Sequence, residues 1–307
     1  KLKSEIMKRA FTKFYDFCSS WTGTVIIVLL VIFFVAQAFV IPSGSMKNTL
    51  LVGDFLFAKK YVYGIPTPRI PWLEVKILPE LNDNGHLITG DGPARGDIVV
   101  FRYPNDEKTH FVKRCFATSE DEIVFTEKAL YLRPKEGDSF IKANCRENLN
   151  GKESKFGYSC KDIVELDGKL FIKEPYRFSG IHYDENVNLF EQMVFMLNTN
   201  KSNVFMKPAL ISSLPQNPNF NFNAFYVKVP KDEYFMIGDN RDHSNDSRFW
   251  GSVAYKDIVG QPWFIYFSWD NNYNVRWERI GRFVDTIEND EFFTKQALKE
   301  GEVDGLH

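Results

Sequence analysis

The stretch WTGTVIIVLLVIFFVAQAFVIPSGSM, residues 21–46, joins a long apolar run to a short polar segment that carries two serines. A helix rises about 1.5 Å per residue, so about 20 apolar residues span the ~30 Å hydrocarbon core of a bilayer. The sequence therefore predicts a single transmembrane helix over residues 21–41. It also places one serine, Ser45, at the membrane surface directly after that helix.

Basic residues before the apolar run set its expected orientation. Residues 1–20 contain five Lys or Arg and only two acidic residues. This bias favours a cytoplasmic N-terminal arm and an extracytoplasmic remainder. The alternative is a cleavable signal peptide, because Ala36-Gln37-Ala38 fits an A-x-A cleavage site. Both interpretations export the rest of the chain.

Composition limits what the exported part does. The net charge of −2 gives no basic footprint, so nucleic acid is not an expected partner. Aromatic residues make up 16% of the chain, which suits β-structure, a surface in contact with lipid, or both. About 265 residues follow the apolar run, enough for one large domain or two small ones.

Three of the four cysteines lie in the exported part, where disulfides persist. Cys145 and Cys160 are close in sequence, and closing a loop of ~15 residues stabilises a fold by roughly 3 kcal/mol. We predict a disulfide between them, with two free thiols as the alternative. Cys115, between apolar neighbours, is expected in the core, and Cys18 is expected to be reduced on the cytoplasmic side.

Most of the exported chain reads as β-structure. Apolar, β-branched runs bounded by Gly and Pro predict strands, at 54–59, 96–103, 123–132, 170–173, 225–229, 234–237 and 263–267. Residues 64–95 are expected to form an extended hairpin or loop. The polar stretch 133–224, with a helix near 188–197, is expected to be a second β subdomain inserted into the first.

These segments predict a mainly β fold: a single N-terminal transmembrane helix, then an antiparallel β core with an inserted second β subdomain. The expected parts are a cytoplasmic arm (1–20), the transmembrane helix (21–41), a first part of the core (42–132), the inserted subdomain (133–224), a second part of the core (225–284) and a tail (285–307). Within the tail we expect a surface helix over 285–300.

A serine hydroxyl needs a base to become a nucleophile. The exported histidines lie in no motif tied to Ser45, and there is no G-x-S-x-G elbow; they are His86, His110, His182, His243 and His307. Lysine serves as a base only when neutral, so burial must lower its pKa. Lys113 lies between apolar residues of a predicted strand, although a strand lysine is more often a solvated charge.

A third segment, Gly238–Gly251, is dense in acidic, amide and basic side chains and follows an apolar strand. A surface turn or a calcium loop is the alternative. The segment lacks the spacing and the bidentate Glu of an EF-hand, so no metal site is expected. Two arginines among the acids indicate a buried ion-pair scaffold.

Together these segments resemble the type I signal peptidases of bacteria, which are membrane-bound Ser/Lys endopeptidases. Pro42-Ser-Gly-Ser-Met46 resembles the nucleophile box, Arg95–Phe101 the central strand box, Val112-Lys-Arg114 the base box, and Gly238–Gly251 the last box. Their order and spacing agree with the family. Residues 133–224 match it poorly.

The resemblance implies a role for each matching residue. Ser45 attacks the scissile carbonyl, and neutral Lys113 takes its proton. The Ser45 backbone N–H and the Ser43 hydroxyl form the oxyanion hole, and Ser244 orients Lys113. The expected scaffold of the site is Asp239, Asp246 and Arg248.

Two shallow substrate pockets are also implied. Ile41, Leu50, Phe111 and Val112 are expected to help line one, and Phe39, Leu56 and Val100 to help line its neighbour. Two small pockets on an extended substrate would give an A-x-A preference, because larger side chains would clash. The expected substrates are signal peptides of exported preproteins, presented at the outer surface of the cytoplasmic membrane. Neither a metal nor a cofactor is expected. The expected partners besides the substrate are the lipid bilayer and, through functional coupling, the protein export machinery.

The chain departs from the family pattern at two places. Asn48 stands where the family usually has Pro, and Ala117–Asp121 replaces a Gly-Leu-Pro-Gly-Asp turn. Both changes are expected to alter local backbone geometry and leave the reacting groups in place. Two other functions stay open: a Ser/Lys peptidase that matures one conjugation or pilus protein, and a membrane-anchored binding protein with a degenerate site.

Overall fold

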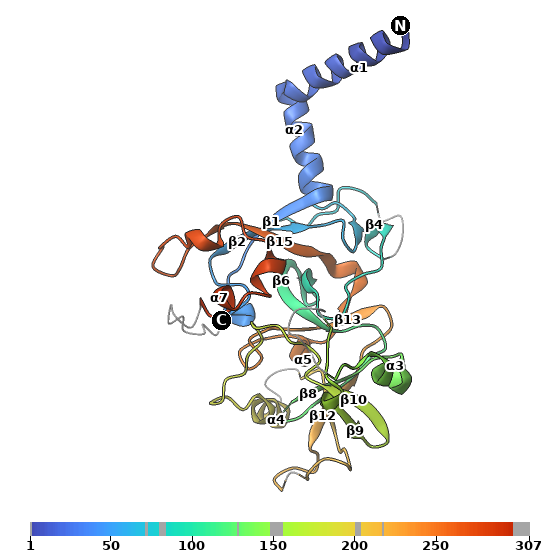
Figure 1. The fold of residues 1–307 in the computed structure, drawn as a ribbon, viewed down its shortest axis with the longest axis vertical. Coiled ribbons are helices and arrows are strands. Elements are labelled where there is room, and N and C mark those ends of the chain that lie inside the picture. Colours follow the sequence, from blue (N-terminus) through green and yellow to red (C-terminus); the bar gives the residue numbers. More distant parts are fainter. Residues whose placement is uncertain are drawn as a thin grey trace.

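The computed structural model describes residues 2–70, 73–79, 84–127, 129–147, 156–199, 204–216 and 218–296. A bent helical arm projects from a body built of antiparallel sheets (Figure 1). His307 and the last four residues of the expected 285–300 helix lie outside the described residues.

The arm consists of α1 (Leu2–Ser19) and α2 (Trp21–Leu30), and a π-helical turn over Val31–Val35 continues the second helix. Ser20 caps α2, because its hydroxyl accepts the Gly23 backbone N–H at 3.1 Å. Within the described part of the chain, no single helix is both long and apolar enough to cross a membrane. Met7–Ser19 and Trp21–Val35, bent by 84°, pass that test only as a pair.

The helix predicted over 21–41 is wrong in its last part. Helical structure ends at Val35, and the chain continues as strand β1 (Ala36–Val40), which pairs with β2 (Asp54–Lys59). Phe39 lies opposite Leu56 in this register and packs against the core of the body. Sequence hydropathy could not separate the two elements, because an apolar helix end and a half-buried strand have the same composition.

The larger sheet has seven strands in the order β1-β2-β15-β5-β6-β13-β14. Its strand β5 is buried on both faces, because Ile98 and Val100 belong to clusters on one side and Val99 and Phe101 to a cluster on the other. The remaining strands are β5 (Ile98–Tyr103), β6 (Asp106–Ala117), β13 (Glu233–Ile237), β14 (Val253–Ala254) and β15 (Ile258–Ser268).

A second sheet of six strands has the order β11-β12-β7-β8-β10-β9. These strands are β7 (Glu122–Phe125), β8 (Leu130–Arg133), β9 (Ile163–Leu166), β10 (Lys169–Lys173), β11 (Lys207–Ala209) and β12 (Ala224–Lys228). The expected single strand over 123–132 is therefore a hairpin of two. Helices α3 (Gly137–Asn144) and α4 (Leu189–Thr199) lie in the segments between these strands.

One core joins the two sheets. Phe116 and Phe235 from the seven-stranded sheet share a buried cluster with Phe125 and Phe225 from the six-stranded sheet. Helix α4 contributes Leu189, Phe190, Met193 and Val194 to that cluster. The helix expected at 188–197 is therefore present, and it packs on the core that the two sheets share.

The second sheet takes up a longer stretch of the chain than the sequence indicates. Strands β7 and β8, expected in the first part of the core, pair with β12 and β10 instead. Residues 122–228 therefore hold all six strands of the second sheet, compared with the expected 133–224. The pairing partner of β7 lies about 100 residues away, so no local pattern marks this boundary.

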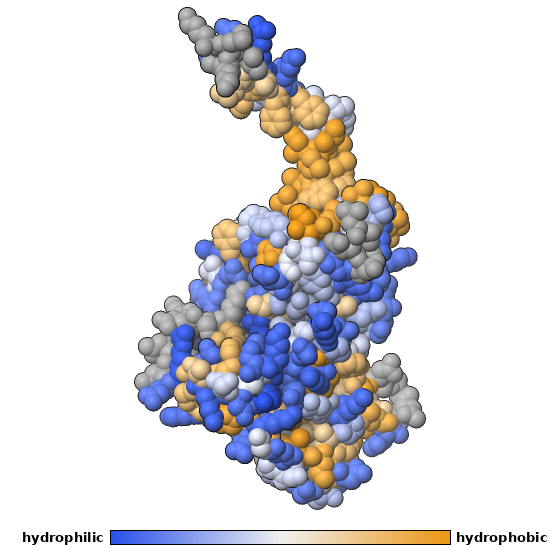
Figure 2. Space-filling view, turned by 90° about the vertical axis from the view of Figure 1, so that its right-hand side faces the viewer, coloured by the Kyte–Doolittle hydropathy of each residue, from blue (hydrophilic) through white to orange (hydrophobic). Residues whose placement is uncertain are grey.

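Residues 64–95 contain a short hairpin, as the sequence predicts for their described part. Its strands are β3 (Gly64–Pro66) and β4 (His86–Thr89), which pair antiparallel. Between them, Leu73, Val75, Ile77 and Leu78 expose between 42% and 61% of their surface. Figure 2 shows apolar surface continuing from the arm onto the adjoining end of the body.

The sequence predicts one surface helix over 285–300, and the structure differs from this prediction. Two short helices, α6 (Val284–Ile287) and α7 (Glu291–Thr294), fold back onto the body. Val284, Ile287 and Phe293 are buried in the same cluster as Ile41 and Leu50. The tail is thus part of the core that supports the nucleophile segment.

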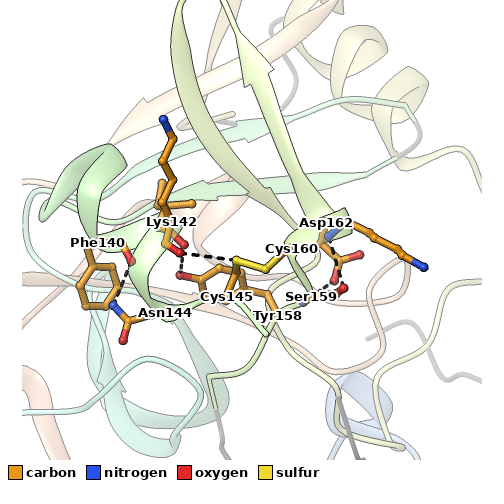
Figure 3. The surroundings of a disulfide bond; sticks show 10 residues. Phe140, Lys142, Asn144, Cys145, Tyr158, Ser159, Cys160 and Asp162 are labelled. Atoms are coloured by element: carbon orange, nitrogen blue, oxygen red, sulfur yellow. Dashed lines mark hydrogen bonds between the residues drawn. A yellow bond between two sulfur atoms is a disulfide. The ribbon is translucent and has the colours of Figure 1, made fainter. Parts of the chain in front are cut away.

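The predicted disulfide is confirmed. Cys145 and Cys160 are bonded, with their Cα atoms 4.9 Å apart. Figure 3 shows the bond tying the end of α3 to the 3₁₀ turn Cys160–Asp162, close to the buried Tyr158. Cys115 is a free, fully buried core residue, also as predicted.

Candidate active site

The segment that carries Ser45 leaves β1 at Pro42 and forms the 3₁₀ turn Gly44–Met46. Backbone and side-chain contacts from Asn240 hold this turn. The Asn240 N–H donates to the Ser45 carbonyl, and the Asn240 side-chain amide donates to the Gly44 carbonyl, both over 3.1 Å. Ser45 is only 9% exposed, so its hydroxyl has a fixed and largely desolvated position.

Lys113 comes to this hydroxyl from β6. Its Nζ donates to Ser45 Oγ over 2.5 Å and to the Val112 carbonyl over 3.2 Å. The two residues are 68 positions apart in sequence. The structure therefore brings together the serine and the lysine that the sequence singles out.

The surroundings of Lys113 favour a neutral amine. Burial lowers the pKa of Lys113 to about 8, because desolvation penalises the ammonium form. The carboxylates of Asp246 and Asp239 oppose this shift, while Arg248 adds to it. The Phe111 ring covers the amine at 5.2 Å from Nζ to the ring centroid. A substantial fraction of Lys113 is therefore unprotonated slightly above neutral pH.

Two buried ion pairs lie behind the lining of the groove and support the segments that form it. Arg114, next to Lys113 in sequence, makes two hydrogen bonds of 2.7 Å to Asp239 and one of 2.9 Å to Glu288. Asp239 also accepts the Thr49 hydroxyl at 2.6 Å, which ties the nucleophile segment to the base strand. All the members of this network are fully or almost fully buried.

The second pair lies in the loop after β13. Arg248 makes two hydrogen bonds of 2.8 Å to Asp246 and one of 2.5 Å to the Arg241 carbonyl. Asp246 also accepts the Gly238 N–H at 3.1 Å and caps the short helix α5 (Ser247–Trp250). These contacts give the loop Gly238–Gly251 a rigid scaffold, as its residue types predict.

Ser43 and Ser244 lie near Ser45 and Lys113, and their hydroxyl groups differ in the contacts that they make. The Ser43 and Ser45 hydroxyl oxygens lie 3.4 Å apart. Ser244 is 4% exposed, and its hydroxyl has no hydrogen-bond partner among the described residues. The expected bond from Ser244 to Lys113 is therefore not formed in this structure, and its orienting role stays a prediction.

A groove of about 490 Å³ opens above Ser45 and Lys113. One wall is the continuous segment 37–46, and the other is the part of β6 from Lys108 to Lys113. Four of the seven expected pocket residues line the groove: Phe39, Ile41, Phe111 and Val112. Leu50, Leu56 and Val100 do not line it; they are fully buried in the clusters on which Phe39 and Val112 pack.

The histidines near the site have other partners. His243 Nε2 lies 3.0 Å from Asp184 Oδ2. His110 lines the groove beside Phe39, and burial lowers its pKa to about 4. In the described part of the chain, no group of three or more His, Cys, Asp or Glu residues has the arrangement of a metal site.

Sequence reasoning missed two contributors to the site. Asn240 lies inside the recognised box, where its type indicated only a polar loop. Glu288 lies about 175 residues from Arg114 in a tail without any motif, so only the fold reveals it. The contribution of Asn240 could have been inferred from the loop pattern. The contribution of Glu288 has no signal in the sequence.

Comparison with protein families agrees with this architecture. The model of the signal peptidase family, peptidase S26, matches residues 15–269. The chain therefore belongs to the signal peptidase family and is a serine endopeptidase.

Similar proteins carry the same family name. The chain is 47% identical to signal peptidase I of Helicobacter pylori strain 26695 over 290 residues, 89% of this chain and 94% of that protein. It is 30% identical to signal peptidase I of Pseudomonas aeruginosa, over 83% of this chain and 72% of that protein. A crystal structure of a signal peptidase I from Enterococcus faecalis is 16% identical, with a TM-score of 0.26, and covers 56% of this chain and 97% of that chain.

Proposed function

We propose that this chain cleaves the N-terminal signal peptides of exported preproteins, using Ser45 as nucleophile and Lys113 as general base. The observation that carries the proposal is the 2.5 Å hydrogen bond between a buried lysine amine and a serine hydroxyl at the floor of a groove. Membership of the signal peptidase family supports the substrate class.

The chemistry follows from the protonation of Lys113. The neutral amine takes the Ser45 proton as Oγ attacks the scissile carbonyl, and it then delivers that proton to the leaving amine. Water then hydrolyses the acyl-enzyme. The Ser45 backbone N–H and the Ser43 hydroxyl stabilise the tetrahedral oxyanion, at about 3 kcal/mol per donor. The residues of this chain supply all these groups without a metal or cofactor.

The groove suits an extended peptide with small side chains. Strand β1 is an edge strand of the seven-stranded sheet, so one side of its backbone is available to pair with a substrate strand. Phe39, Ile41, Phe111 and Val112 narrow the groove beside this edge. Because successive side chains of an extended chain alternate, two such positions separated by one residue would admit Ala, the A-x-A pattern. Leu50, Leu56 and Val100 support these walls from behind.

The arm supports a position at the outer surface of the cytoplasmic membrane. The continuous helical segment Trp21–Val35 exposes apolar side chains along its length and is about 22 Å long, at 1.5 Å per residue. It ends directly at β1, so a bilayer around this segment would lie next to the groove. We propose that this segment and Met7–Ser19, which only as a pair are long and apolar enough for a membrane span, attach the enzyme to the bilayer in a single pass. The catalytic body is extracytoplasmic in this proposal, with access to preproteins leaving the export machinery.

Cleavage of a synthetic peptide with Ala at positions −3 and −1 tests the proposal. Ser45→Ala and Lys113→Met are each expected to reduce kcat/KM by at least a thousandfold, and the double variant is expected to be no worse, because the two groups act as a unit. Lys113→Met replaces a buried amine by an apolar side chain of similar length, so the thermal midpoint should not fall. Substantial turnover by either folded single variant would contradict the assignment.

A further inference from the structure

A second pocket lies beside the catalytic groove. It has a volume of about 370 Å³ and lies between α4 and the loop that contains α5. Its apolar walls include Leu189 and Met196 from α4 and Phe249 and Trp250 from α5. Its polar lining includes Gln192 and the carboxyl group of Asp242. This composition suits one apolar side chain of moderate size, held next to polar groups.

The pocket and the groove meet next to the nucleophile. His243 and Asn245 line both cavities, and Ser244 between them lines the second pocket. A Cβ placed on Gly238 would lie 2.4 Å from both Ser244 Oγ and the Ser45 carbonyl oxygen. The shared wall at 243–245 therefore lies at the Ser45 end of the groove, next to the turn that carries the nucleophile.

The order of the groove wall fixes which part of a substrate reaches the second pocket. One end of the groove is formed by Gln37, at the base of the helical arm, and its wall follows β1 towards Ser45. Residues before the scissile bond occupy this part in the function proposed above. The segment after the bond must leave past Ser45, where the wall at 243–245 opens into the second pocket.

Strand alternation selects the residue. In an extended peptide, the side chains at −3 and −1 share one face, and the next side chain on that face is the second after the scissile bond. We propose that the pocket between α4 and α5 binds an apolar side chain at this +2 position and so makes the enzyme selective for the start of the mature protein. The inference rests on the function proposed above.

A peptide series tests the inference on the full-length enzyme in detergent micelles. The peptides keep Ala at −3 and −1 and carry Leu, Ala or Lys at +2. We expect kcat/KM to be about tenfold higher for Leu than for Ala, as is typical for an apolar side chain that enters an apolar pocket. A matched peptide with Leu at +1 and Ala at +2 should gain nothing, because its side chain points to the other face.

Enzyme variants assign the preference to this pocket. Met196→Glu is expected to abolish the Leu-over-Ala ratio and to raise the relative rate of the Lys peptide. Phe195→Glu, on the same helix with 62% of its surface exposed, should keep the wild-type ratios. Met196→Ala gives a milder test if the Glu variant does not fold.

The outcomes separate the two proposals. If wild-type enzyme cleaves none of the peptides, the proposed function fails. If it cleaves them all at the same rate whatever stands at +2, the function stands and the inference is overturned. A Leu preference that persists in both Met196 variants would also overturn it.

Discussion

The pKa of Lys113 is the property on which the proposed chemistry depends. Free lysine titrates at 10.5, and burial brings the pKa of Lys113 to about 8. Only the neutral amine accepts the Ser45 proton, so kcat/KM should rise with pH through about 8 and level off above it. A pH–rate profile of the wild-type enzyme measures this directly.

Histidine variants are the control for that profile. His110→Ala and His243→Ala are expected to cleave peptide and to keep the alkaline rise, because neither residue supplies the base. A histidine base would instead give a rise near ~6.5, or near the lower pKa of about 4 that burial gives His110. A folded His variant as inactive as Ser45→Ala would contradict the Ser/Lys assignment.

At the level of residues, the structure brings Ser45 and Lys113 together as the sequence predicts, because the chemistry of these two side chains singles them out. Sequence and structure differ on which apolar residues line the groove, because burial determines that. Leu50, Leu56 and Val100 have the right apolar character for a pocket, but they are fully buried in the layer behind the groove. A sequence pattern reports that a side chain is apolar, and only the packing reports which neighbour covers it.

At the level of elements, the two departures from the family pattern fall at unusual backbone positions. Asn48 has φ of 73° and Glu120 has φ of 68°, both in the left-handed region. Proline cannot adopt such a φ, so the backbone at Asn48 differs from that of a relative with Pro there. Asn tolerates this conformation, whereas Glu120 adopts it at some cost in strain.

The positions of the strands were easier to predict from the sequence than the pairing between them. Residues 54–59 form β2 with the bounds that the sequence indicates. The partner of β7 is β12, about 100 residues later, and the last apolar residues of the expected membrane helix pair as β1. Local periodicity defines an element, and its partners follow from long-range packing that no window of sequence contains.

The disulfide of the second sheet is expected to stabilise that unit without serving catalysis. It closes a loop with a sequence separation of 15, worth roughly 3 kcal/mol in the chain-entropy model. The double variant Cys145→Ser, Cys160→Ser should lower the free energy of unfolding by about that amount in urea titrations and still cleave peptide. Wild-type protein with reductant should match it. An unchanged midpoint would show that the bridge contributes nothing.

For the whole molecule, the proposed topology makes a separate prediction. Five basic residues against two acidic ones in residues 1–20 favour a cytoplasmic arm. Protease added to spheroplasts should therefore digest the sheet body and leave the N-terminal arm protected, as followed with antibodies to each part. Detergent should remove the protection. A body that resists protease until detergent is added would reverse the orientation and separate the groove from exported substrates.

The buried network of Arg114, Asp239 and Glu288 has a consequence for how the enzyme is made. It joins the middle of the chain to a residue close to its end, and Asp239 extends it to Thr49 beside the nucleophile. Loop closure across such separations comes late in folding. A nascent chain that already contains Ser45 and Lys113 still lacks the carboxylate that completes their support. The buried support of the site is therefore expected to be complete only after synthesis has passed Glu288, so a chain that stops before this residue should not yet be an active protease.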